Sequence, residues 1–168
     1  RKRYNISDDV KLCLYAPTFR DGNSLDQYNL DYTRLKDILC GRFGGKWDII
    51  VRFHNVTKNR FGENLKVNGA IDVSDYADIQ EILACIDVGI TDYSSWICEY
   101  MLRRKPGFIF ATDASEYVNN ERNLFFGLKE LPFPVAENIE TLEDNIRCFD
   151  EATFEKNCDV FLKDKGSV

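Results

Sequence analysis

Two serines stand where the sequence passes from one apolar run to the next. Ser94 and Ser95 end the segment Thr-Asp-Tyr-Ser-Ser, which separates the runs 87–90 and 96–102. A serine at a helix start can cap the helix by accepting a hydrogen bond from a free backbone amide. The hydroxyls and free amides can instead bind a phosphate, because the positive end of the helix dipole favours an anion. The pattern alone leaves both interpretations open.

A carboxylate follows one helical turn after the serines. Glu99 interrupts an otherwise apolar helical pattern and lies four residues beyond Ser95, so both side chains fall on one helix face. There the carboxylate could accept hydrogen bonds from the hydroxyls of a ribose or a polyol. A solvated or ion-paired surface side chain is the alternative.

His54 and Arg20 are the other two candidates for phosphate chemistry. His54 is the only histidine, and it ends one apolar run and opens a basic segment. An imidazole beside a bound phosphate could act as a general acid or base near neutral pH. Arg20 follows Pro-Thr-Phe in a predicted turn, and a guanidinium suits bidentate contact with phosphate. The alternatives are a structural histidine and a surface ion pair of Arg20 with Asp21 or Asp26.

Alternating strand and helix signals position these side chains. Strands are expected at 11–16, 47–53, 69–73, 87–91 and 107–111, and helices at 31–43, 76–86, 95–104, 141–149 and 153–163. Residues 55–68 are expected to be polar and irregular, and Ser74 and Asp75 offer caps for the helix that follows them.

The alternation predicts an α/β fold with a parallel sheet and helices on both faces. Ligands of such sheets bind outside the carboxyl ends of the strands. The polar residues that follow the strands should therefore gather at one edge of the sheet: Arg20, His54, Ser74, Asp75, Asp92, Ser94, Ser95, Thr112 and Asp113.

Composition narrows the class of protein. The 168 residues, with a net charge of -6, predict one domain over 1–168 and argue against broad nucleic-acid binding, which needs a basic face. The six cysteines form no C-x-x-C pair, and five of them (Cys13, Cys40, Cys85, Cys98 and Cys148) are expected to be buried, reduced thiols. We predict no metal site and no membrane span. The basic run 103–105 is assigned to a helix end, with contact to anionic lipid as the alternative.

Several stretches together resemble the C-terminal half of the CDP-glycerol:poly(glycerophosphate) glycerophosphotransferases of bacterial teichoic acid and capsule synthesis. They occur in the family's order: LYAPTFRDG (14–22), IIVRFHN (49–55), the long central stretch 71–100, KPGFIFATDASEY (105–117), and ERNLFF with LPFPV (121–135).

The resemblance implies a two-domain, Rossmann-like fold of the GT-B type. This chain would be its C-terminal, nucleotide-binding domain, without the N-terminal, acceptor-side domain. It further implies a CDP-linked polyol phosphate as donor, with no cofactor or metal. Carried over by position, the site comprises His54 and Arg20 as catalytic residues, Ser94, Ser95 and Arg122 at the donor diphosphate, and Glu99 near the nucleotide ribose.

The sequence also departs from the family pattern. The family's His-Gly-Thr motif belongs to its N-terminal half and is absent, so the isolated chain is not expected to catalyse transfer. The usual Pro-Gly-Pro near the end is Pro132-Phe133-Pro134, and the segment after His54 is polar rather than apolar and aromatic. These two differences leave the polyol and the acceptor open.

The resemblance thus predicts a transferase that moves a polyol phosphate, most simply glycerol phosphate, from a CDP-linked donor to a hydroxyl of a cell-wall or capsular polymer. CMP would be released. The expected partners are the donor and a lipid-linked polymer acceptor bound through the other domain. Nucleic acid is not an expected partner. We expect a cytoplasmic protein whose full-length form contacts the cytoplasmic membrane face. A nucleotide-sugar glycosyltransferase and a non-catalytic nucleotide-binding or interaction domain are the alternatives.

Overall fold

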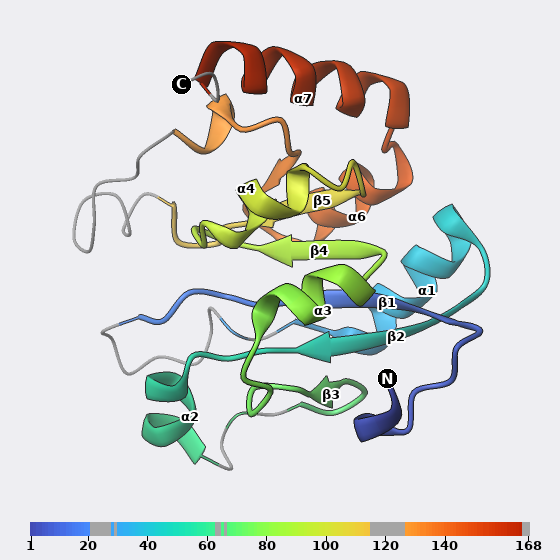
Figure 1. Ribbon diagram of the computed structural model, residues 1–168, viewed down its shortest axis with the longest axis vertical. Coiled ribbons are helices and arrows are strands. Elements are labelled where there is room, and N and C mark those ends of the chain that lie inside the picture. Colours follow the sequence, from blue (N-terminus) through green and yellow to red (C-terminus); the bar gives the residue numbers. More distant parts are fainter. Residues whose placement is uncertain (21–27, 29, 63–64, 66, 115–126, 166–168) are drawn as a thin grey trace.

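A six-stranded, fully parallel sheet forms the centre of the protein. The computed structural model describes residues 1–20, 28, 30–62, 65, 67–114 and 127–165. The strands lie in the order β3-β2-β1-β4-β5-β6 (Figure 1). Their bounds are Val10–Tyr15 (β1), Lys46–Val51 (β2), Ile71–Asp72 (β3), Val88–Thr91 (β4), Gly107–Phe110 (β5) and Val135–Ala136 (β6). This strand order is that of the doubly wound dinucleotide-binding fold, so the predicted fold class is confirmed.

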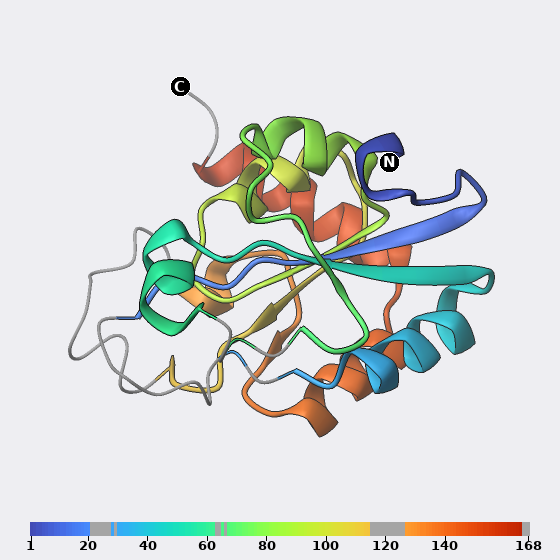
Figure 2. The same ribbon diagram turned by 90° about the horizontal axis from the view of Figure 1, so that it is seen from below.

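Helices cover both faces of the sheet. Figure 2 shows α3 and α4 on one face and α1 and α6 on the other. The helices are Tyr32–Phe43 (α1), Asn55–Phe61 (α2), Ile79–Cys85 (α3), Trp96–Met101 (α4), Ile139–Arg147 (α6) and Glu151–Lys165 (α7). The central strands β4 and β5 are buried along their whole length, which explains why they are unbroken apolar runs in the sequence.

Two glycines bring α4 close to the sheet. A Cβ at Gly89 would lie 3.0 Å from the Trp96 ring and 3.1 Å from the Tyr100 ring, both on α4. A Cβ at Gly107 would lie 2.7 Å from the Phe133 ring and 3.3 Å from Ile97. Phe133 is 4% exposed. The aromatic ring therefore occupies the space that Gly107 leaves open.

Gly107→Ala should lower the free energy of unfolding by about 1–3 kcal/mol, because the added methyl group overpacks a buried site. Urea unfolding followed by circular dichroism measures the change. Gly41→Ala is the matched control, since Gly41 lies on α1 and has no heavy atom within 4 Å of its potential Cβ. The control should be neutral or stabilising by up to about 1 kcal/mol. Equal stability of Gly107→Ala and the wild type would contradict the packing argument.

Two local predictions were wrong. Residues 55–61, expected to be irregular, form α2, whose cap is the imidazole of His54 rather than one of the usual short polar side chains. Helix α3 is capped by Asp78, not by Ser74 or Asp75. Ser74 instead lies beside the end of β2, where its hydroxyl accepts a hydrogen bond from the amide of Phe53 at 2.9 Å.

The prediction of buried thiols holds only in part. All six cysteines are free, but Cys40, Cys85 and Cys148 are exposed. Cys85 ends α3, Cys148 directly follows α6 and Cys40 lies in the last turn of α1, where an apolar neighbourhood in sequence does not imply a buried side chain. Cys13 on β1 is fully buried, and burial raises the pKa of its thiol.

Among the described residues, no helix combines the length and apolar character needed to cross a membrane. The same residues contain no group of three or more His, Cys, Asp or Glu side chains placed to hold a metal ion.

Candidate functional site

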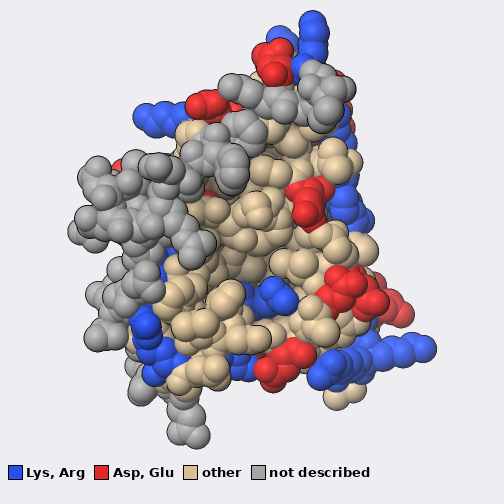
Figure 3. Space-filling model, turned by 60° about the vertical axis from the view of Figure 1, so that its left-hand side comes forward, with Lys and Arg blue, Asp and Glu red and all other residues tan. Residues whose placement is uncertain are grey.

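The strand order reverses direction at the boundary between β1 and β4. From β1 the chain continues to β2 and β3 on one side, and from β4 to β5 and β6 on the other. Ligands of open parallel sheets bind at this switch point, outside the carboxyl ends of the strands. Figure 3 turns this edge toward the viewer: uncharged side chains cover most of its centre, and a basic group is exposed among them. The segments after β1 and β4 therefore define the candidate site.

Asp92 joins these two segments. One carboxylate oxygen accepts the Thr18 amide at 2.8 Å, the Thr18 hydroxyl at 2.7 Å and the Tyr93 amide at 2.6 Å. The other oxygen accepts Nη2 of Arg20 at 2.7 Å. Asp92 is 3% exposed, so a buried carboxylate with four donors holds the β1 end against the β4 end.

Arg20 lies inside this network rather than on the surface. Its Nε donates to Asp113 at 2.7 Å, its Nη2 to Asp92, and its Nη1 to the Thr18 carbonyl at 2.7 Å. Arg20 as a whole is 4% exposed. Its guanidinium carbon lies over the Tyr93 ring, 4.8 Å from the ring centre. The structure thus supports an ion-paired Arg20, although with partners far away in sequence. Asp21 and Asp26, the expected partners, lie outside the described residues.

Asp113 completes the cluster from the end of β5. Burial by itself raises the pKa of its carboxyl group. The hydrogen bonds from Arg20 and Tyr93 and the charge of Arg20 together outweigh burial, so the pKa of Asp113 is lowered from its usual value. The Tyr93 hydroxyl donates to Asp113 at 2.8 Å, and burial and this carboxylate raise the pKa of the phenol. Asp113 is therefore a charged acceptor, and β1, β4 and β5 are tied together at one edge.

The two serines do not cap α4 as the pattern suggested. Ser95 is the N-cap residue, but its backbone is already helical (φ -65°, ψ -17°) and its side chain makes no capping hydrogen bond. Ser94 is half-buried and Ser95 is exposed. The backbone carbonyl of Ser95 accepts the Cys98 amide at 3.0 Å. The capping interpretation is thus wrong for Ser95, and its hydroxyl remains open to a ligand.

His54 lies at the same edge, after β2, and its ring caps α2. The Nδ1 atom accepts the Val56 amide at 3.2 Å, which places the proton of a neutral imidazole on Nε2. The side chain is exposed, and its ring centre lies 6.2 Å from that of Phe19. An Nε2–H group at this position can donate a hydrogen bond to a bound phosphate.

Glu99 and Arg122 are less well defined by the structure. Glu99 is exposed and accepts a hydrogen bond from the Gln80 side chain on α3, so it is a paired surface group in the absence of ligand. The structure therefore shows Glu99 as a paired surface side chain, which was the alternative interpretation. Contact of Glu99 with a ribose stays a prediction. Arg122 lies outside the described residues.

The family model for CDP-glycerol:poly(glycerophosphate) glycerophosphotransferases matches residues 1–162. The chain belongs to this family.

Two curated relatives illustrate the range of this glycerophosphotransferase family. The chain is 31% identical over 158 residues to a teichoic acid glycerol-phosphate transferase of Staphylococcus aureus, covering 92% of this chain and 40% of the relative. It is 35% identical over 142 residues to the teichoic acid ribitol-phosphate polymerase TarL of the same organism, covering 80% and 24%. The chain thus spans less than half the length of either relative.

Solved structures agree with the sequence comparison. The wall teichoic acid polymerase TagF superposes with a TM-score of 0.72 at 30% identity, covering 97% of this chain and 41% of TagF. A variant of TagF soaked with CDPG superposes with a TM-score of 0.70, also at 30% identity, covering 97% and 38%. The fold of this part of TagF is therefore present across nearly the whole chain.

Sequence reasoning about the family residues missed the roles of Asp92 and Asp113. Both were placed at the sheet edge, because each follows a strand closely, but neither was assigned a partner. The sequence does contain a signal for this cluster. An aspartate follows each of two strands near the switch point, and an arginine follows the first strand. The structure shows that the three form one ion-pair cluster.

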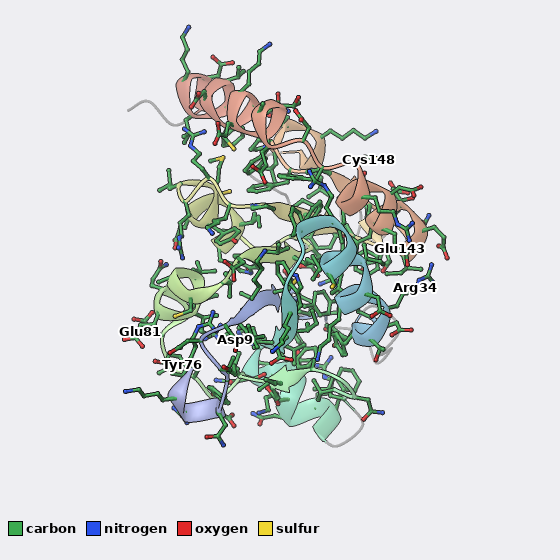
Figure 4. All side chains as sticks on the ribbon, turned by 90° about the vertical axis from the view of Figure 1, so that its right-hand side faces the viewer. Asp9, Arg34, Tyr76, Glu81, Glu143 and Cys148 are labelled. Atoms are coloured by element: carbon green, nitrogen blue, oxygen red, sulfur yellow. The ribbon has the colours of Figure 1, made fainter. Side chains whose placement is uncertain are left out.

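Two surface hollows lie away from this edge. One of about 510 Å³ lies between α1 and α6, where Arg34 and Glu143 approach each other (Figure 4). Arg147 also pairs with Glu143 at 3.7 Å. The other, of about 430 Å³, lies between residues 129–134 and α7. Neither hollow includes His54, Ser94 or Ser95, so we assign the site by topology and side-chain chemistry.

Proposed function

We propose that this chain is the donor-binding part of a transferase that moves a polyol phosphate from a CDP-linked donor to a hydroxyl of a cell-wall or capsular polymer. Glycerol phosphate is the proposed group, and CMP is the leaving product. The observation that carries the proposal is the carboxyl edge of the sheet in a member of this family, where Ser94 and Ser95 follow β4 and His54 follows β2. The CDPG-soaked TagF structure, similar over 97% of the chain, supports this donor class.

In the proposed reaction an acceptor hydroxyl oxygen attacks the β-phosphorus of the donor. A new phosphorus–oxygen bond forms, the bond to the bridging oxygen breaks, and CMP leaves with the electron pair. Catalysis would consist of positioning and charge stabilisation. His54 would donate a hydrogen bond from Nε2 to the leaving phosphate, whereas the base that takes the hydroxyl proton would come from another part of the full-length protein. No cofactor or metal is part of this proposal.

The other residues would bind the donor. Ser94 and Ser95, with Arg122, would contact the diphosphate, and Glu99 would exchange its bond to Gln80 for the ribose hydroxyls. Arg20 acts in this proposal through Asp92 and Asp113, by holding the β1 and β4 segments in position. Direct contact of Arg20 with the transferred phosphate would require it to give up one of these buried bonds.

The acceptor and the location belong to the same proposal. A lipid-linked polymer would bind outside the donor edge, which is the carboxyl edge of the sheet where Ser94, Ser95 and His54 lie. The full-length protein would contact the cytoplasmic face of the membrane peripherally. Flotation with anionic lipid vesicles, with and without the polymer acceptor, tests this contact.

The Ser94→Ala, Ser95→Ala double variant should bind CDP more weakly by about 1–3 kcal/mol, the value of one or two hydrogen bonds to a charged group. Isothermal titration calorimetry measures the change. Ser7→Ala is the matched control, because Ser7 precedes β1 at the opposite edge of the sheet. CDP affinity unchanged in the double variant would restrict both serines to a structural role.

Turnover assays decide between the donor classes. The full-length protein should release CMP with CDP-glycerol or CDP-ribitol when a polymer acceptor is present. CDP-ribitol belongs in the test because the ribitol-phosphate polymerase TarL is 35% identical over 142 residues. Exclusive turnover of UDP-sugars would favour a glycosyltransferase of the same architecture, and absence of both turnover and CDP binding would favour an interaction domain.

A further inference from the structure

Arg52 is an arginine at the donor edge with no role assigned above. It follows β2 directly, and its amide donates to the Tyr15 carbonyl at 3.0 Å, so the β1–β2 ladder continues to this residue. Strand residues alternate between faces. Leu14 pairs with both Ile50 and Gly89, and paired residues of parallel strands point to the same face of the sheet. Gly89 faces α4, so Ile50 faces α4 as well. Arg52, two residues after Ile50, projects from that same face. Arg52 therefore shares the sheet face on which α4 begins.

The guanidinium of Arg52 lacks a protein partner among the described residues. Its Nε is buried and makes no hydrogen bond, although the residue as a whole is half-buried. Neighbouring cations differ: Arg20 pairs with two carboxylates, and Lys58 pairs with Asp72 and Asp75. A buried donor without an acceptor is costly, and native proteins rarely retain one without a reason.

The charge at this edge indicates which kind of ligand the Arg52 guanidinium would bind. Asp92 and Asp113 carry two negative charges against the single positive charge of Arg20, so this cluster is net negative. A diphosphate placed beside it needs a further cation. Arg52 supplies one on the same edge, two residues before His54.

We propose that Arg52 binds the diphosphate of the donor, with its guanidinium donating to phosphate oxygens. The inference rests on the proposed function, because it names a further binding residue of the same site. A planar guanidinium fits two phosphate oxygens, whereas an ammonium group offers only a point charge.

The test compares Arg52→Met and Arg52→Lys in the full-length protein, with calorimetric titration of CDP, cytidine and inorganic pyrophosphate. Arg52→Met should raise the Kd for CDP about 10- to 100-fold. Its affinity for cytidine should stay unchanged, and Arg52→Lys should fall between Met and the wild type. Arg147→Met is the matched control, since Arg147 is exposed on α6 on the opposite face. The melting temperature of Arg52→Met should not fall, because this side chain has no hydrogen bond to lose with any residue that the structure describes.

Each other outcome overturns a specific claim. If the wild type binds CDP and Arg52→Met binds it equally well, the role of Arg52 is refuted and the proposed function stands. A lowered melting temperature with parallel loss of CDP and cytidine would make Arg52 a structural residue. If the wild type binds pyrophosphate through Arg52 but not CDP, the donor assignment fails and the anion contact stands. No binding of either ligand by the wild type refutes both.

Discussion

Asp92→Ala should lower the free energy of unfolding by about 3–5 kcal/mol, the largest stability effect we expect from a single substitution in this chain. The carboxylate is 3% exposed and accepts hydrogen bonds from Thr18, Arg20 and Tyr93. Its removal leaves a buried guanidinium with one carboxylate instead of two, and leaves the amides of Thr18 and Tyr93 without their acceptor. Urea unfolding at neutral pH measures the loss.

Two further variants show whether the ion pair itself is responsible. Asp9→Ala, at an exposed aspartate before β1, should leave stability unchanged. Asp92→Ala in an Arg20→Met background should cost less than in the wild type, because the guanidinium that Asp92 pairs with is already absent. A loss below about 1 kcal/mol for Asp92→Ala alone would show that the edge does not depend on this carboxylate.

His54→Ala in the full-length protein should reduce transfer by about 100- to 1,000-fold, the usual contribution of one hydrogen-bond donor to the charge that develops in the transition state. CDP binding should largely survive, because His54 is proposed to act on the leaving phosphate rather than to hold the nucleotide. Turnover is followed as CMP release from CDP-glycerol, and CDP affinity is measured in parallel.

His54 also caps α2, so a second variant is needed to separate the two roles. Asparagine is a strong N-cap residue and can accept the Val56 amide in place of Nδ1. His54→Asn should therefore keep the stability that His54→Ala loses, about 1 kcal/mol, and yet be equally inactive. Wild-type turnover by His54→Asn would remove the imidazole from the mechanism.

The fold could be predicted because its strongest signals are local. Strands β4 and β5 are buried on both faces, so each is a continuous apolar run between turn residues. The misses were short elements. Helix α2 has seven residues, one fully buried side chain (Thr57) and a histidine cap, which together give almost no helical pattern. Strand β6 has two residues beside Pro134.

The candidate site could be located from sequence but its contacts could not. Topology brings strand ends to one edge, and that much follows from the alternation of strands and helices. The partners of Arg20 are 72 and 93 residues away, at Asp92 and Asp113. Local spacing instead suggested Asp21 or Asp26. That no described acceptor reaches the Arg52 Nε also appears only in three dimensions.

The Asp92 network also determines when the donor edge forms during folding. Its contacts join Thr18 to a residue 74 positions later and Arg20 to one 93 positions later. Such contacts carry the entropy cost of closing long loops, so they form only after β1, β4 and β5 have come together. During synthesis, the β1 side of the site leaves the ribosome long before Asp113 does. A nascent or partly folded chain therefore has no weakened version of this edge, and the edge that we propose to bind the donor forms in one late step.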